Sequence, residues 1–161
     1  TAAARAVQVA AFRRPDTDDE PIEARLLDEL RECDGWLPAL SIVGVVDGVI
    51  VGHVVTTRGF VGDVPALGLG PIGVLPSHQH HGVGLALMHA AIGAADALDE
   101  PLIALLGSTV YYARYGFVAA TTLGITAPDP AWGAHFQVRT LTAYRPDVRG
   151  QFRYASPFDT M

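Results

Sequence analysis

Apolar residues recur along this chain with two periods, and together they predict alternating helices and strands. Spacings of three and four residues are typical of helices with one buried face, whereas alternating or short continuous apolar runs indicate strands. The first period predicts helices at residues 2–13, 21–33, 82–98 and 108–114. The second predicts strands at residues 39–46, 49–57, 64–75, 101–106, 117–125, 134–141 and, at a sheet edge, 151–154.

Glycine and proline refine this pattern. Asp47-Gly48 favours a tight type I′ hairpin, because both central residues of that turn adopt positive φ. Residues 59–62 are expected to form a loop. Pro71 cannot donate to a sheet ladder, so it predicts a bulge or a splayed strand within residues 64–75. The helix at 82–98 is apolar nearly all round and is expected to be well buried.

Length and composition limit the class of protein. The chain has 161 residues, half of them hydrophobic, which suits one mixed α/β domain over residues 1–161. A net charge of −6 argues against a nucleic-acid partner, since phosphate contacts need basic side chains. No apolar run is long enough to suggest a membrane span. Cys33 is the one cysteine, so it forms no internal disulfide, and it is expected to be inert packing. A reducing cytoplasm is therefore the expected compartment.

Two motifs suggest chemistry that the surrounding residues do not support. Residues 68–73 match G-x-G-x-x-G, but Pro71 breaks the pattern and no helix opens within it, so we favour glycines that relax a bulged strand. His78, His80 and His81 resemble a metal cluster. They share one short loop with no carboxylate or cysteine nearby in sequence, so we expect no metal.

The stretch from Gln79 to Gly84, read Q-x-x-G-x-G, has better physical support. Gly82 and Gly84 let the backbone approach a bulky anion closely. The N–H groups of about His80 to Leu85 would be unpaired donors in the first turn of the following helix, where the helix dipole also favours negative charge. The pattern therefore predicts an anion site at this helix start.

Val74 followed by Gln79-x-x-Gly82-x-Gly84 resembles the acyl-CoA-binding signature of the GNAT superfamily of N-acyltransferases. Residues 111–117, YYARYGF, resemble that superfamily's Y-x-x-x-G-F segment after the next strand. The double tyrosine and the tail residues 150–154 and 157–158 look like a bacterial branch of predicted N-acetyltransferases. The resemblance covers essentially the whole chain.

The resemblance implies a mixed, mostly antiparallel, splayed central sheet with helices on both faces. It also implies acetyl transfer from acetyl-CoA to a primary amine by direct attack in a ternary complex. The acceptor, a small molecule or a protein amine, is not identified, and relatives often form homodimers. The superfamily normally begins with a strand, whereas this chain opens inside the first helix, so that strand either lies outside this sequence or is missing from the sheet.

The same resemblance assigns residues to acetyl-CoA. The splayed strand would pair the pantetheine arm, and the turn from Gln79 would hold the pyrophosphate. Ser108 would contact the cofactor, with a plain helix cap as the alternative. The cofactor-binding residues implied are Ile72, Gly73, Val74, Gln79, His80, His81, Gly82, Val83, Gly84, Leu85 and Ser108.

For catalysis, Tyr112 aligns with the family's general acid, which hydrogen-bonds or protonates the departing thiolate. One alternative is that Tyr112 is only a core aromatic residue. Another is that Tyr115 is the general acid. His53 is the best titratable candidate for a base, although a hydrogen-bonded sheet histidine is the favoured interpretation and loss of the amine proton to water stays open. Two other functions remain: a non-catalytic acyl-CoA-binding module, and a regulatory protein that has lost the cofactor.

Overall fold

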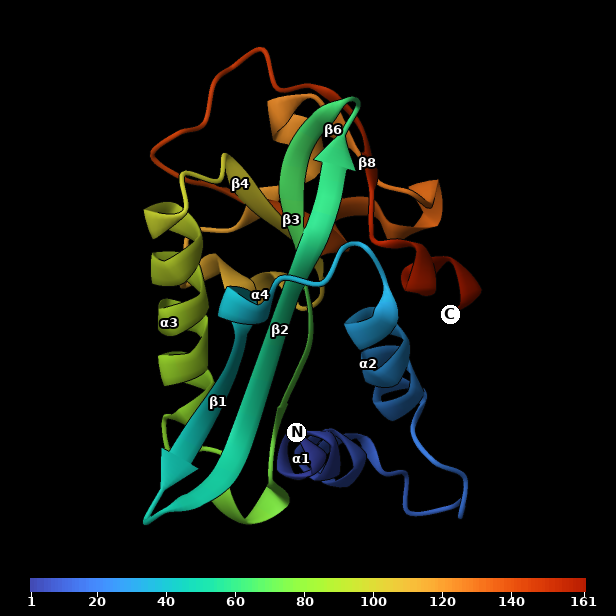
Figure 1. Cartoon of the computed structure of the whole chain (residues 1–161). Helices are drawn as coiled ribbons and strands as arrows, with labels where there is room; N and C mark the ends of the chain where they lie inside the picture. The colour runs from blue at the N-terminus through green and yellow to red at the C-terminus, as the bar shows by residue number, and fades with distance from the viewer.

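The computed structural model describes all residues, 1–161, and has one sheet of eight strands with helices on both faces (Figure 1). The α-helices are α1 (Ala2–Phe12), α2 (Ile22–Glu32), α3 (Val83–Ala97) and α4 (Thr109–Ala113). The strands are β1 (Ser41–Val46), β2 (Val49–Val61), β3 (Val64–Val74), β4 (Leu102–Leu106), β5 (Val118–Ala119), β6 (Ile125–Thr126), β7 (Phe136–Thr140) and β8 (Gly150–Arg153). Their order is β5-β7-β4-β3-β2-β8-β6, with β1 also on β2. Only the β3–β4 and β6–β8 pairs are parallel, so the mixed, mostly antiparallel sheet is confirmed.

The long strand β2 organises the sheet (Figure 1). β3 pairs along one edge of it, while β1 and β8 share the other edge, β1 at the start and β8 at the end. The predicted loop at 59–62 is wrong, because β2 continues to Val61 and turns only at Gly62, where φ is +56°. Gly59 is a strand residue beneath the ring of Phe152, since a Cβ there would lie 2.7 Å from Phe152 Cζ.

Two further expectations for the C-terminal half are wrong. The predicted strand at 117–125 is replaced by the two-residue strands β5 and β6, which a 3-10 turn (Ala120–Leu123) and Gly124, at φ +72°, separate. β8 is not an edge strand, because it lies between β2 and β6. In both cases the short segments obtain their strand pairing from residues distant in sequence, which a local pattern does not record.

Helices cover the two faces with different partners. On one face α3 packs against β1, β2 and β3, and Leu87 and Met88 join a buried cluster with Val54 and Leu67. On the other face α1 lies against β2 and β3, and α2 forms a cluster that also takes in Ala155 of the C-terminal segment. Figure 1 accordingly shows the C-terminal turn beside α2.

α3 is less buried than its apolar sequence predicts. Only Leu87, Met88, Ala91 and Ala95 are buried, and Leu85 is 47 % exposed. The outward positions carry mostly alanine and glycine, which expose little apolar surface each, so this helix tolerates one solvent face without a polar stripe.

The bulge and the splay that Pro71 predicts are both present. β2 and β3 pair as Thr56↔Leu69 and then Val54↔Ile72, so β3 holds one extra residue at Gly70-Pro71. β3 and β4 pair at only two positions, Leu67↔Ile103 and Gly68↔Ala104. Beyond Gly68 the two strands separate, and this split positions everything described below.

Candidate functional site

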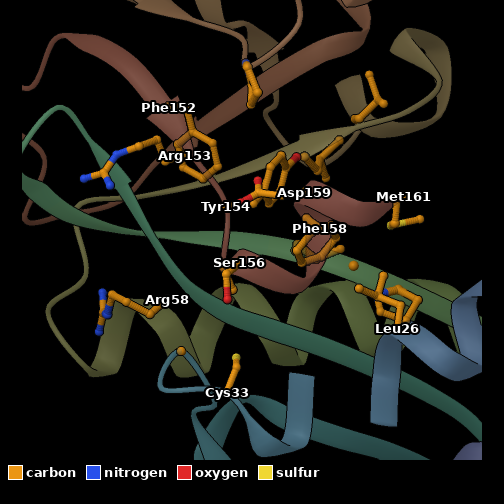
Figure 2. Close-up of a pocket in the computed structure, with 18 of the residues that line it drawn as sticks. Leu26, Cys33, Arg58, Phe152, Arg153, Tyr154, Ser156, Phe158, Asp159 and Met161 are labelled. Atoms are coloured by element: carbon orange, nitrogen blue, oxygen red, sulfur yellow. The ribbon is translucent and has the colours of Figure 1, made fainter. Parts of the chain in front are cut away.

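A cavity of about 1170 Å³ opens on the α2 face where β3 and β4 separate (Figure 2). The bulge of β3 forms part of its lining through residues 69–72, and the end of β4 contributes Leu105 and Leu106. The rest comes from α2 and the loop after it, from β2, from the loop around Trp132, and from the C-terminal segment. The cavity therefore gathers residues from nearly the full length of the chain.

Tyr112 reaches this cavity from the other side of the sheet. It belongs to α4 and packs on the α3-side cluster, yet it also lines the cavity. Its ring lies against Gly107 at the end of β4, where a Cβ would lie only 2.5 Å from Tyr112 Cε2. Glycine at that position is what lets the tyrosine enter the split.

The Tyr112 hydroxyl is free of protein partners. Among the three clustered tyrosines, the one hydroxyl hydrogen bond runs from Tyr115 Oη to Tyr111 Oη, at 3.1 Å. Burial, with a smaller contribution from Tyr111, raises the pKa of Tyr112 to about 12. Tyr112 is thus a neutral hydrogen-bond donor over the physiological range. Tyr115 is 5 % exposed and has its hydroxyl engaged, so the geometry favours Tyr112 over Tyr115 as the group that meets a ligand.

The turn before α3 exposes a row of free amides. The N–H groups of residues 80–85 donate to no acceptor in the protein, and the first internal bond of the helix is Ala86 N to Gly82 O at 3.0 Å. His80 and Gly82 adopt positive φ, +64° and +85°, which turns successive amides toward one concave side. This arrangement fits a phosphate group, as the Q-x-x-G-x-G pattern predicts.

A cation lies close to the same turn. A Cβ on Gly84 would lie 3.2 Å from Tyr111 Oη, so Tyr111 covers the first turn of α3. The Arg114 guanidinium stacks over the Tyr111 ring at 4.8 Å from its centroid. The sequence pattern did not single out Arg114, because only the fold brings α4 to the start of α3.

The edge of β3 that faces the split carries backbone groups that pair with no neighbouring strand. Leu75 N donates to Val51 O at 2.8 Å, and hydrogen-bonded positions alternate along an antiparallel pair, so Gly73 faces β2. The backbone groups of Ile72 and Val74 consequently point toward the edge that β4 has left. Gly73, the other residue predicted there, packs against Gln8 of α1 and has no free backbone on that edge.

Gln79 and Ser108 both hold backbone in place. Gln79 Nε2 donates to Val74 O at 3.1 Å, which ties the turn to the end of β3. Ser108 Oγ accepts from Tyr111 N at 3.1 Å and caps α4, so the helix-cap alternative for Ser108 is the one the geometry supports. Each residue orients a neighbour of the site.

His53 lies outside the cavity. It is fully buried, and both ring nitrogens are engaged, Nδ1 with Gln8 Nε2 at 3.1 Å and Nε2 with Ser41 Oγ at 2.9 Å. Burial, with smaller effects from Arg31 and the N-terminal ammonium, lowers its pKa to about 4. This placement supports the favoured interpretation, a sheet histidine, and gives His53 no access to a substrate proton.

The histidines of the loop before α3 form no metal centre. The structure contains no cluster of three or more His, Cys, Asp or Glu side chains that could hold an ion. His80 and His81 are exposed beside the free amides, and His78 Nδ1 bonds to Ser77 Oγ at 2.8 Å.

None of the helices is both long and apolar enough to cross a membrane.

The aromatic side of the cavity is the part that sequence reasoning missed. Its wall consists of Trp132, Phe152, Tyr154 and Phe158, which belong to a 3-10 turn (Pro130–His135), to β8 and to the C-terminal segment after β8. In the sequence, the tail contributes only to the family resemblance. Its aromatic spacing at 152, 154 and 158 was the available signal, but only the fold brings these rings opposite α2.

The sequence description of the acetyltransferase (GNAT) family matches residues 4–117. The chain is 34 % identical over 146 residues to the uncharacterized N-acetyltransferase YjhQ of Escherichia coli K12, covering 86 % of this chain and 81 % of that one. A GNAT acetyltransferase from Brucella melitensis, solved with acetyl-CoA, superposes with a TM-score of 0.77 at 29 % identity, over 98 % of this chain and 91 % of that one. YhbS of Escherichia coli, solved with CoA, has the same fold, with a TM-score of 0.84 at 24 % identity over 96 % of this chain and 84 % of the other.

Proposed function

Because the chain belongs to the GNAT acetyltransferase family, we propose that it transfers the acetyl group of acetyl-CoA to a primary amine by direct attack in a ternary complex. One observation carries the proposal: free amides, a free strand edge and Tyr112 meet at one split in the sheet, with a cavity on its far side. A protein that only holds CoA has no use for that cavity, which argues against the non-catalytic module.

The residues present fit acetyl-CoA. The amides of residues 80–85 and the dipole of the 15-residue α3 suit the pyrophosphate, and Arg114 adds positive charge beside them. The backbone groups of Ile72 and Val74 can pair with the amides of the pantetheine arm as a neighbouring strand would. When bound, acetyl-CoA supplies an activated thioester.

In the proposed reaction Tyr112 hydrogen-bonds to the sulfur as the carbon–sulfur bond breaks. The neutral amine forms a carbon–nitrogen bond, and the proton that its nitrogen then releases ends on the thiolate, either through water or relayed by the Tyr112 hydroxyl. A thiol has a pKa of about 8.5, well below that of Tyr112, so donating a hydrogen bond is more favourable than complete proton transfer from the tyrosine.

The attacking amine must first lose the proton of its ammonium form. His53 is buried with both ring nitrogens bonded, so we assign this step to water. The carboxylates that line the cavity, Glu23, Asp34 and Asp159, attract the cationic amine before that loss.

Two measurements test the proposal. Calorimetry is expected to show saturable binding of acetyl-CoA to the protein, and a thiol assay is expected to show CoA release that requires an added amine. Absence of binding at millimolar acetyl-CoA would contradict the cofactor site. Binding without thiol release for any amine would instead leave a non-catalytic module.

A further inference from the structure

The far side of the cavity is an aromatic wall built on two glycines. The ring of Phe152 covers Gly59, and the ring of Tyr154 covers Gly68, where a Cβ would lie 2.6 Å from Tyr154 Cδ1. Gly68 is the last position at which β3 still pairs with β4. The wall therefore begins where the split begins.

The wall is continuous toward the C-terminus. The ring centroids of Tyr154 and Phe158 are 4.6 Å apart, and those of Tyr154 and Trp132 are 6.3 Å apart. Tyr154, Phe158 and Trp132 are each half-buried and line the cavity, so part of every ring remains open to it. Figure 2 shows Tyr154 and Phe158 in the middle of the cavity, with Leu26 and Met161 at one end. A flat apolar group can pack against these faces.

The charged side chains that line the cavity differ in whether they form ion pairs within the protein. Arg58 is held by Glu100 through both terminal guanidinium nitrogens and also donates to Ala66 O, whereas Arg153 stacks over the Phe60 ring at 5.2 Å and forms no ion pair. Glu23, Asp34 and Asp159 form no ion pair within the protein. The side chains free to meet a ligand are therefore mainly negative, which favours a cation.

We propose that this cavity is the acceptor site and selects a small cationic primary amine carried on a flat, apolar ring. The proposal rests on the proposed acetyl transfer. The ring packs against Tyr154, Phe158 and Trp132, the carboxylates attract the ammonium group, and the amine reaches the split beside Tyr112. An aliphatic polyamine would leave the aromatic wall without a matching surface, and a peptide would place polar backbone against it.

The test compares amines of different shape at equal charge sign. Thiol release is measured with 2-phenylethylamine, spermidine and a C-terminally amidated tripeptide whose N-terminal residue is alanine. We expect kcat/KM for 2-phenylethylamine to exceed that of the other two by at least about tenfold. A preference for spermidine or for the peptide would overturn the inference and leave the acetyltransferase proposal standing.

A binding measurement separates the two proposals. The protein has two tryptophans, so Trp36→Phe leaves Trp132 as the sole indole reporter in the cavity wall. In the CoA-loaded protein, 2-phenylethylamine is expected to change the Trp132 fluorescence saturably, and the acid analogue 3-phenylpropionate is not. If 2-phenylethylamine bound saturably but no amine caused thiol release, acetyl transfer would be refuted, while the assignment of this cavity as an amine-binding site would stand. No fluorescence change at 2-phenylethylamine concentrations that saturate turnover, or at about 10 mM where there is no turnover, would refute the site assignment.

Matched variants locate the effect. Phe158→Ala is expected to raise the KM for 2-phenylethylamine at least about fivefold, with kcat and acetyl-CoA affinity within about twofold. Glu23→Gln is expected to raise that KM about threefold, whereas Glu32→Gln, on an exposed part of the same helix, leaves it unchanged. Equal effects of the two glutamate variants, or an unchanged KM for Phe158→Ala, would contradict the proposed placement.

Discussion

The two sides of the split, which we propose bind the cofactor and the acceptor, are built from different materials. The cofactor side uses backbone: the edge of β3 at Ile72 and Val74 and the amides of residues 80–85 lie within one continuous stretch of chain. The acceptor side uses side chains that are far apart in the sequence, as in Leu26, Trp132 and Phe158. A ligand shared by a whole family can be bound by main-chain groups, while a ligand particular to one member needs side chains that can vary.

Tyr112 is the residue that belongs to both sides, and its removal should give the largest effect. Tyr112→Phe keeps the ring against Gly107 and removes only the hydroxyl, so we expect kcat to fall at least about tenfold with acetyl-CoA affinity unchanged. Steady-state kinetics and calorimetry measure the two quantities. Tyr115→Phe is the control, and unchanged turnover in Tyr112→Phe would transfer the role to Tyr115 or to solvent.

Gly82→Ala tests the backbone side alone. Gly82 has φ +85° with no atom near a new Cβ, and Gly48 in the β1–β2 hairpin has φ +76° with the same open space. Alanine strains both turns by about 1 kcal/mol, but only Gly82 shapes the row of amides. We expect acetyl-CoA to bind about tenfold more weakly to Gly82→Ala, and normally to Gly48→Ala. Equal affinities would show that the amides of residues 80–85 do not hold the cofactor.

Gly68→Ala tests the acceptor side alone. The new methyl group would displace the Tyr154 ring from β3, so we expect an amine KM about fivefold higher, a stability loss of about 1–3 kcal/mol, and little change in acetyl-CoA affinity. Gly93→Ala, on the open face of α3, is the control and should not destabilise the protein. A matching loss of acetyl-CoA affinity in Gly68→Ala would mean that the two sides are not separable.

His53 should have the smallest effect on the site, because it belongs to neither side. Its pKa is about 4 in the folded chain and 6.5 ordinarily, so the folded state resists protonation. Between those pH values the unfolded chain takes up a proton that the folded chain does not, and stability falls as the pH falls, by up to about 1.4 kcal/mol per pH unit. Urea unfolding at pH 7, 6 and 5 measures this slope, which His53→Gln should flatten. If kcat depended on the protonation of His53 more steeply than stability does, His53 would have a role in the mechanism.

The unexpected structures at Gly59 and at residues 117–125 share one physical cause. Glycine often marks turns, so the sequence predicts a loop at Gly59, but in the structure Gly59 makes room for Phe152, a residue distant in sequence. The segment 117–125 looked like one strand, yet each of its two short strands pairs with a different distant segment, β7 or β8. Local sequence carries no record of such partners.

The sequence by itself determined the proposed cofactor side. The broken strand, the Gln79 turn and the two glycines act through main-chain groups that are neighbours in sequence, so their spacing is sufficient to predict a phosphate-binding helix start. Tertiary structure alone decided the proposed acceptor side. Trp132, Phe158 and Leu26 acquire their common surface only when the C-terminal segment packs beside α2, because contacts between distant side chains depend on topology and not on local periodicity.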